Sequence, residues 1–165
     1  CRCCSARYPR LGSPCTCTGS GCSDTNFTTG TITGCESAVV PPGTGGVVGC
    51  LRSIHEATSG TDTYYAGGYC TIMAVTCSGF FCGMVPQPGT YSTVACPAGT
   101  YRHQESRSVM GMTISTRSCL RNCTSDLDCR WNNNDAFWSS CGHYQCLTPI
   151  GAPSGTRVCG DERQY

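Results

Sequence analysis

Residues 69–77 read YCTIMAVTC, and this stretch does most to decide the fold. It combines aromatic, β-branched and other apolar residues, which is the composition of a β-strand. Because side chains alternate along a strand, one face carries Cys70, Ile72, Ala74 and Thr76. The other face carries the odd-numbered residues of the same run. The stretch therefore predicts a strand with two distinct faces and a cysteine on each.

Shorter segments of similar composition lie on both sides of this run. Residues 80–85 follow the turn dipeptide Ser78-Gly79, so residues 69–85 predict a β-hairpin. Further strands are predicted at residues 28–33, 63–65, 91–96 and 112–116. No window of a dozen residues keeps a helical apolar pattern. The predicted fold class is mainly β and disulfide-rich, a small sandwich or irregular meander with short strands and Cys-dense, loop-rich terminal segments.

Cysteine accounts for 18 of the 165 residues, which is typical of a disulfide scaffold in an oxidising compartment. The count is even, so every thiol can pair. The spacings never form the paired C-x-x-C units of a structural zinc site, which favours disulfides over a metal cluster. Sequence leaves the pairing open. The expected half-cystines are Cys1, Cys3, Cys4, Cys15, Cys17, Cys22, Cys35, Cys50, Cys70, Cys77, Cys82, Cys96, Cys119, Cys123, Cys129, Cys141, Cys146 and Cys159.

The charge and apolar content exclude several classes of protein. Only 13% of residues are charged, the formal net charge is +1, and all 11 basic residues are arginine. This leaves no basic surplus for binding nucleic acid and no apolar run of the roughly 20 residues that a membrane helix needs. Hydrophobic residues are 39% of the chain, so the core is thin and covalent links are expected to replace part of its burial.

The cysteine distribution and the start of the chain suggest an organisation and a location. We expect a Cys-dense N-terminal segment (1–35), a β-rich core (36–118) and a Cys-dense C-terminal module (119–165) within one compact unit. The chain begins at Cys1 with no signal-peptide pattern, which predicts a mature secreted or cell-surface product. A lipid anchor on Cys1 is a less favoured alternative, because acylation would leave an odd number of thiols.

One stretch resembles known disulfide modules. Residues 123–149 contain CTSDLDC followed by SCGHYQCLTP. This pattern resembles the C-x-S-D-x-D-C modules of Cys-rich secreted and surface proteins, and part of a whey-acidic-protein core. The adjacent Cys-Cys pair of that core is missing here, and three residues separate Gly142 from Cys146 where the core has two. The resemblance implies a small disulfide module more than a protease inhibitor.

No arrangement of residues predicts catalysis, a metal site or a cofactor. The histidines His55, His103 and His143 lack the motifs that would pair them with a nucleophile or a zinc ion. Asp126 and Asp128, together with residues 132–135 (NNND), offer oxygen ligands of the type that Ca²⁺ prefers. The glycine and closing glutamate of an EF-hand are absent, so a polar turn is the favoured interpretation. We therefore expect that the protein is not an enzyme.

Asn26 and Asn122 each begin an N-glycosylation sequon, NFT and NCT. These sequons matter only if the chain passes through a eukaryotic secretory route. The arginines at 2, 7 and 10 and at 117, 121 and 130 form two basic groups, whose guanidinium groups can bind carboxylates and stack on tyrosine. Independently of these arginines, glycans are kept as candidate partners, and the sequons make them candidate modifications.

The composition favours an extracellular structural role. Low charge weakens self-repulsion, and eight Tyr, four Phe and two Trp supply anchors for interfaces. We expect a disulfide-stabilised subunit of a filament, coat or matrix, with copies of itself as partners and with neither nucleic acid nor a membrane span. The alternative is a secreted binding module, either a protease inhibitor or a glycan-binding protein. Its candidate reactive loop is residues 99–118, which contain Arg102, Arg107 and Met110.

Overall fold

A computed structural model describes residues 11–13, 15–19, 30–36, 38–56, 61–129, 144–149 and 151–161, with the backbone alone at 52–56, 61–67, 144 and 161. The strands are β1 (Thr16–Thr18), β2 (Thr31–Thr33), β3 (Val47–Glu56), β4 (Thr61–Gly79), β5 (Thr100–Val109), β6 (Met112–Arg121), β7 (Tyr144–Leu147) and β8 (Val158–Asp161). Three short 3-10 helices accompany them: η1 (Cys82–Met84), η2 (Tyr91–Thr93) and η3 (Asp126–Asp128). Over these ranges there is no α-helix, and no helix that could cross a membrane.

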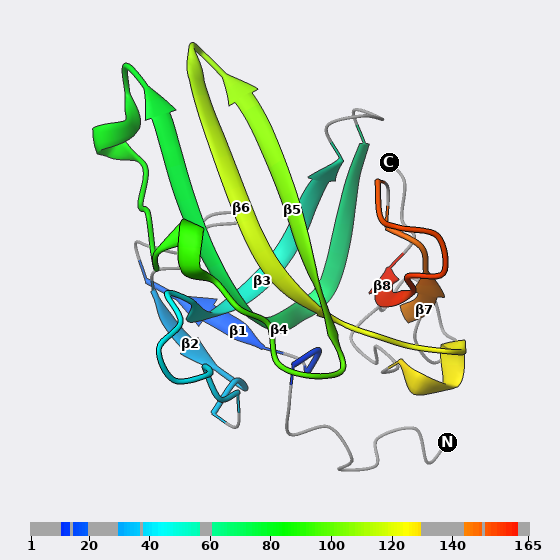
Figure 1. Cartoon of the computed structure of the whole chain (residues 1–165). Helices are drawn as coiled ribbons and strands as arrows, with labels where there is room; N and C mark the ends of the chain where they lie inside the picture. The colour runs from blue at the N-terminus through cyan, green and yellow to red at the C-terminus, as the bar shows by residue number, and fades with distance from the viewer. Residues whose placement is uncertain are drawn as a thin grey trace.

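The strands form one four-stranded sheet and two small ribbons, so the prediction of a mainly β fold is confirmed (Figure 1). The central sheet has the order β3-β4-β6-β5, and all of its strand pairs are antiparallel. β1 pairs with β2, and β7 pairs with β8. In Figure 1 the β7–β8 ribbon lies on one side of the sheet and the β1–β2 ribbon lies below it. The division into residues 1–35, 36–118 and 119–165 stays a prediction.

The long strand β4 organises the sheet because its two halves have different partners. Residues 61–73 pair with β3, whereas residues 73–79 pair with β6. The register with β3 shifts between Leu51 and Ser53, where β4 carries extra residues that bend it. Figure 1 shows the two halves of β4 diverging from this bend. The sheet curls as a result, and β3 also contacts β5 although two strands separate them in the sheet.

Side-chain hydroxyls continue the contact between β4 and β6 where the strands diverge. The Thr71 hydroxyl donates to the Cys119 carbonyl over 2.9 Å and accepts from the Cys119 amide over 3.1 Å. The Tyr69 hydroxyl accepts a hydrogen bond from the Arg121 amide over 2.8 Å. Both side chains are fully buried. They satisfy backbone groups of β6 that would otherwise be buried without partners, which is costly.

The core divides into three clusters, and the two faces of β4 contribute to different ones. Tyr69 packs with Leu51, Leu120 and Val158 against the cysteines of the C-terminal ribbon. On the opposite face, Ile72 and Ala74 pack with Leu11 and Val94, and Cys70 joins a cluster made almost entirely of cysteines. The alternation predicted for residues 69–77 is therefore confirmed. Disulfide sulfur fills much of the interior of this thin core.

Several strand predictions need correction. The hairpin predicted at residues 69–85 is wrong, because β4 ends at Gly79, the Cys77–Cys82 disulfide closes a short loop after it, and residues 82–84 form η1 from the end of that loop. The strand predicted at 91–96 is also wrong, since residues 91–93 form η2. Residues 63–65 and 69–77 belong to the single strand β4, and residues 112–116 are confirmed as the first half of β6. Of residues 28–33, the structure shows 31–33 as β2.

Candidate functional site

Six disulfides join the described cysteines: Cys15–Cys50, Cys35–Cys70, Cys77–Cys82, Cys96–Cys119, Cys123–Cys146 and Cys129–Cys159. Cys17 is also disulfide-bonded, so every described cysteine is oxidised. Cys1, Cys3, Cys4, Cys22 and Cys141 lie outside the described residues. Disulfides in this number are consistent with an oxidising, extracellular or secretory environment.

The disulfides follow one pattern in two parts of the molecule. Cys50 faces Cys70 across β3 and β4, yet these two bond to Cys15 and Cys35, which lie outside the sheet. In the same way, Cys146 faces Cys159 across β7 and β8, and each bonds to a cysteine of the 123–129 segment. Each strand pair is thereby linked by two bridges to a segment packed on its face.

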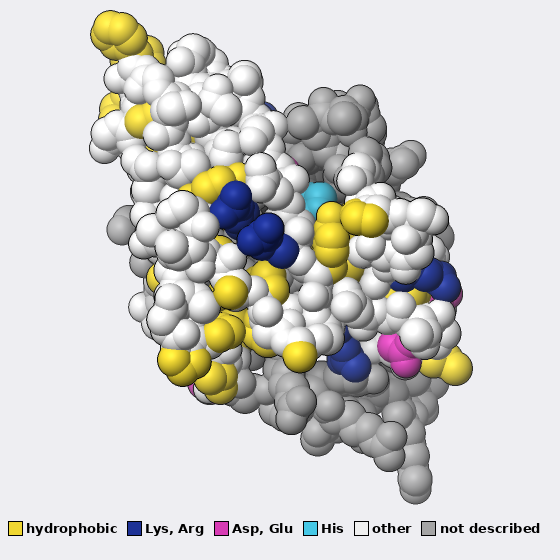
Figure 2. Space-filling model, viewed as in Figure 1, with side chains coloured by type: hydrophobic (Ala, Val, Ile, Leu, Met, Phe, Trp, Pro, Cys, Tyr) yellow, Lys and Arg dark blue, Asp and Glu magenta, His cyan; other side chains and the backbone are white. Residues whose placement is uncertain are grey.

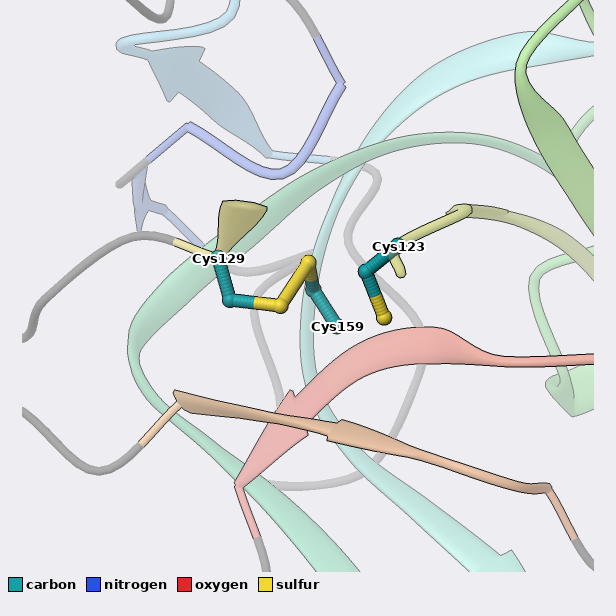
Figure 3. A group of neighbouring side chains, drawn as sticks. All are labelled: Cys123, Cys129 and Cys159. Carbon is teal, nitrogen blue, oxygen red and sulfur yellow. A yellow bond between two sulfur atoms is a disulfide. The ribbon is translucent and has the colours of Figure 1, made fainter. Parts of the chain in front are cut away.

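The second of these arrangements brings three sulfur atoms together. Cys123, Cys129 and Cys159 have ligand atoms within 4.8 Å of one another, and all three are buried (Figure 3). Such a group could be mistaken for a metal-binding cluster. Cys129 and Cys159 are joined to each other, however, and Cys123 is joined to Cys146. Thiolates bind zinc and sulfur in a disulfide is not a thiolate, so the cluster consists of two neighbouring cross-links.

The carboxylates of Asp126 and Asp128 stabilise a turn by accepting hydrogen bonds from backbone amides. One Asp128 carboxylate oxygen accepts hydrogen bonds from the Thr124 amide and hydroxyl, both over 2.7 Å, and from the Ser125 amide over 3.0 Å. These bonds, with a smaller effect of the Arg121 charge, lower the pKa of Asp128 to about 2. Asp126 accepts from the Cys146 amide over 2.8 Å. Both carboxylates hold backbone groups next to the disulfide cluster; residues 132–135 lie outside the described part of the chain.

Of the three histidines, only the His103 side chain is described. It lies on the face of the sheet opposite to Arg102, is 4% exposed, and is flanked along β5 by Tyr101 and Glu105. Burial lowers the pKa of His103 to about 4. Its Nε2 is buried with no hydrogen-bond partner among the described residues. Ser118 faces His103 across β5 and β6, but His103 Nε2 makes no hydrogen bond to it. A buried neutral imidazole without such a bond supports packing and does not by itself indicate catalysis.

The depressed His103 pKa predicts a pH-dependent stability. His103 takes up a proton near pH 6.5 in the unfolded chain and near pH 4 in the folded chain. Its contribution to the free energy of unfolding is therefore fully present above about pH 6.5 and is lost as the pH falls toward 4. The expected loss is at most about 3 kcal/mol. Urea unfolding of His103→Gln should show a flatter pH dependence in this window. As a control, Asp128→Asn should change the pH dependence of stability only between about pH 4 and pH 2. An unchanged slope of stability against pH in His103→Gln would contradict the prediction.

The end of the sheet farthest from the ribbons presents an apolar tip, which we define as Phe80, Phe81, Met84 and Met110. Their exposed fractions are 96%, 50%, 77% and 84%. The Cys77–Cys82 disulfide closes the loop that carries Phe80 and Phe81. Met110 lies at the β5–β6 turn, and this turn is adjacent because Gly79 pairs with Met112. The tip is thus held by a cross-link and two strand turns, with its large side chains in solvent.

The stretches of sequence that form the tip and flank it carry no charge. Between Asp62 and Arg102 the sequence has no charged residue and no histidine, and residues 108–116 have none either. The upper-left corner of Figure 2 shows hydrophobic side chains among uncharged ones. This tip was not predicted from the sequence. The signal that could have found it was the long uncharged run around the phenylalanine pair.

The residues of the candidate reactive loop form a paired hairpin. Residues 100–109 and 112–121 are β5 and β6, joined by the two-residue turn Met110-Gly111, in which both residues have positive φ. The span 99–118, predicted as a candidate reactive loop, therefore consists of two paired strands and a tight turn. The register places Arg102, Gln104 and Arg117 on one face. Arg107 and Glu105 project to the other, so the two arginines proposed for that loop lie on opposite sides of one strand.

Arg117 is fixed in place by its neighbours. Its Nη1 donates to the Tyr91 carbonyl over 2.6 Å and to the Ser92 carbonyl over 3.3 Å, and its Nε donates to Gln104 over 3.2 Å. The guanidinium lies 4.2 Å from the centre of the Tyr91 ring, a cation–π contact. Arg102 is exposed and sits diagonally across from Arg117 in the register. Arg117 is therefore held in one position, whereas the Arg102 guanidinium is exposed to solvent and open to a ligand.

Of the two predicted glycosylation sites, the structure describes only the one at Asn122. Asn122 is exposed and directly follows β6. Its backbone amide donates a hydrogen bond to the Gly99 carbonyl over 3.0 Å. In the folded chain the third residue of this sequon, Thr124, bonds to Asp128, and the middle residue Cys123 is in a disulfide. Asn26 lies outside the described residues. Glycosylation at both positions stays a prediction.

Comparison of the chain with protein-family models, curated proteins and solved structures returned no match. The resemblance of residues 123–149 to disulfide modules therefore supports no family assignment. Within that stretch Cys123 bonds to Cys146, but Cys129 bonds to Cys159 outside it. What is established is a cysteine-rich β protein with six described disulfides.

Proposed function

We propose that the protein is an extracellular structural subunit that assembles with copies of itself into a filament, coat or matrix. The observation that carries the proposal is the apolar tip, whose four large side chains stand in solvent on a cross-linked support. Exposed apolar patches of this kind mark interaction sites, because covering them removes apolar surface from water. The absence of charge around the tip lets a like surface approach without repulsion or charge desolvation.

The size of the tip favours a weak contact over a stable dimer. At roughly 200 Å² for each large side chain, the exposed fractions amount to about 600 Å². A stable pairwise interface needs about 800 Å² from each partner. A contact slightly below that size is weak alone, but it becomes effective when each subunit makes several contacts in an ordered assembly. A protease-inhibitor role is less favoured, because its candidate loop is a paired hairpin.

The proposal predicts that the tip controls assembly. Phe80→Ser/Phe81→Ser removes the two aromatic anchors and should raise the concentration needed for assembly by about 30-fold or more, the effect of losing an interface hot spot. Sedimentation velocity and negative-stain electron microscopy over a concentration series would measure this.

Leu127→Ser and Val39→Ser are matched controls, since Leu127 is 77% and Val39 is 74% exposed, and neither belongs to the tip. They should assemble as the wild type does. A wild-type protein that stays monomeric at high concentration contradicts the proposal, and so does an equal loss of assembly in the controls.

A further inference from the structure

The exposed face of the β5–β6 hairpin carries two arginines, Arg102 and Arg117, that have no carboxylate neighbour among the described residues. Its residues alternate with those of the buried face and include Arg102, Gln104 and Arg117, with Arg121 at its lower end. The one carboxylate of the two strands, Glu105, projects to the opposite face. Hydrogen bonds from Thr124 and Ser125 account for most of the lowering of the Asp128 pKa, and the charge of Arg121 makes a small further contribution, so Arg121 has a carboxylate nearby. The pair Arg102 and Arg117 has no such neighbour among the described residues.

The charges are arranged so that one anion could bridge them. Arg102 faces Cys119 and Arg117 faces Gln104, which makes the two arginines diagonal neighbours on adjacent strands. Diagonal side chains on a sheet are about 7–8 Å apart at their bases, within reach for guanidinium groups. Two cations this close repel each other, and binding an anion between them removes that cost. Because Arg117 is already fixed by Tyr91, Ser92 and Gln104, little entropy is lost in ordering it.

Beyond the arginines the same face continues as a field of hydroxyl groups. Its members are Ser106, Ser108, Thr113 and Ser115 of the hairpin and Thr76 and Ser78 of β4. All of these side chains are exposed or half-buried, and the Ser106 and Ser115 hydroxyls are 2.7 Å apart. In Figure 2 basic side chains lie together near the centre of the view, with a small hydrophobic patch directly above them and a mainly uncharged surface beyond it. Hydroxyl groups can both donate to and accept from the hydroxyls of a sugar.

We propose that this face, which we call the arginine face, binds an acidic polysaccharide. Its carboxylate or sulfate groups would lie on Arg102 and Arg117, and its sugar hydroxyls would lie along the Ser/Thr field. Guanidinium groups bind such planar or tetrahedral oxyanions through paired charge-assisted hydrogen bonds. A nucleic acid fits less well, because the chain has a formal net charge of only +1 and the Tyr91 ring beside Arg117 is half-buried and already covered by that guanidinium, so it is not open for base stacking. The inference is independent of self-assembly, since it uses a different surface.

The test compares two arginines of the same strand. Arg102→Gln and Arg107→Gln change the net charge equally, but only Arg102 lies on the arginine face. Binding to heparin (sulfated), polygalacturonate (carboxylated), dextran (neutral) and single-stranded DNA would be measured by microscale thermophoresis. The assays would use the Phe80→Ser/Phe81→Ser background, so that assembly and binding are read separately.

We expect the protein with an unchanged arginine face to bind at least one acidic polysaccharide and not to bind dextran. Arg102→Gln should weaken that binding by about tenfold, the usual effect of losing a charge-assisted hydrogen bond, whereas Arg107→Gln should leave it within about twofold. Preference for heparin or for polygalacturonate then assigns the anion as sulfate or carboxylate. Three results would overturn the proposal: equal losses of binding in the two variants, binding to DNA as tight as or tighter than binding to the polysaccharides, or no binding to either heparin or polygalacturonate.

Discussion

Gly68→Ala is expected to destabilise the protein by about 2–5 kcal/mol. Gly68 lies in the bend of β4 with φ +69°, a conformation that costs an L-residue roughly 1–2 kcal/mol. A Cβ at this position would lie 2.6 Å from the Cys50 sulfur and 2.9 Å from the Cys15 sulfur, and it would also meet the Cys15 carbonyl. The two sulfurs belong to one disulfide and cannot move apart, so the backbone has to shift.

The matched control is Gly99→Ala. Gly99 also has a positive φ, +79°, but a Cβ there would meet no atom within 4 Å. It should therefore cost only the conformational term, roughly 1–2 kcal/mol. Urea unfolding of both variants under non-reducing conditions would measure the difference, and non-reducing mass mapping would show whether Cys15–Cys50 still forms in Gly68→Ala. Equal losses in the two variants would show that the crowding at the disulfide has no effect.

Removal of the Cys129–Cys159 disulfide in Cys129→Ala/Cys159→Ala is expected to cost about 3–4 kcal/mol from loop closure alone. The bridge links positions 30 residues apart and lies in the buried cluster that holds β8 against Leu51, Tyr69 and Leu120. Both cysteines are almost fully buried, so the shorter alanines also leave space in the core. We expect the β7–β8 ribbon to become open to proteases at temperatures where the wild type resists them.

Cys77→Ala/Cys82→Ala is the comparison. This bridge spans a separation of only 5 residues and its cysteines are half-buried, so its loss should cost about 2 kcal/mol or less. Thermal unfolding followed by circular dichroism, combined with limited proteolysis and peptide mapping, distinguishes the two variants. A larger loss at Cys77–Cys82 than at Cys129–Cys159 would contradict the ranking. The same variant also tests whether the cross-link is needed to present Phe80 and Phe81 for assembly.

Local sequence rules succeeded where the signal is compositional or periodic. The share of cysteine predicted a cross-linked protein, and the alternation in residues 69–77 assigned Tyr69 and Ile72 to opposite faces, which pack into different clusters. The rules failed at residues 80–85 and 91–96, whose apolar and β-branched residues are typical of strands. There the Cys77–Cys82 bridge and packing against β4 impose short 3-10 turns, so tertiary context overrides propensity.

The candidate sites were harder to predict because they depend on register. Arg102 and Arg107 look equivalent in the sequence, and the sequence does not show whether Gln104 or Glu105 lies beside Arg117. The pairing of Thr100 with Arg121 and of Val109 with Met112 decides which of them share a face with Arg117. A shift of one residue would have put Glu105 beside Arg117 and given the face a salt bridge in place of an uncompensated charge.

By itself the sequence determined that this is a disulfide-linked, mainly β, nearly neutral protein, because cysteine content, strand composition and charge are properties of residues and their immediate neighbours. The tertiary structure alone decided which cysteines bond. Cys50 and Cys70 face each other across two strands, yet each bonds to a distant segment, and Cys146 and Cys159 do the same. Bridge formation requires a short distance and a suitable direction between two Cβ atoms, and these depend on how distant segments pack.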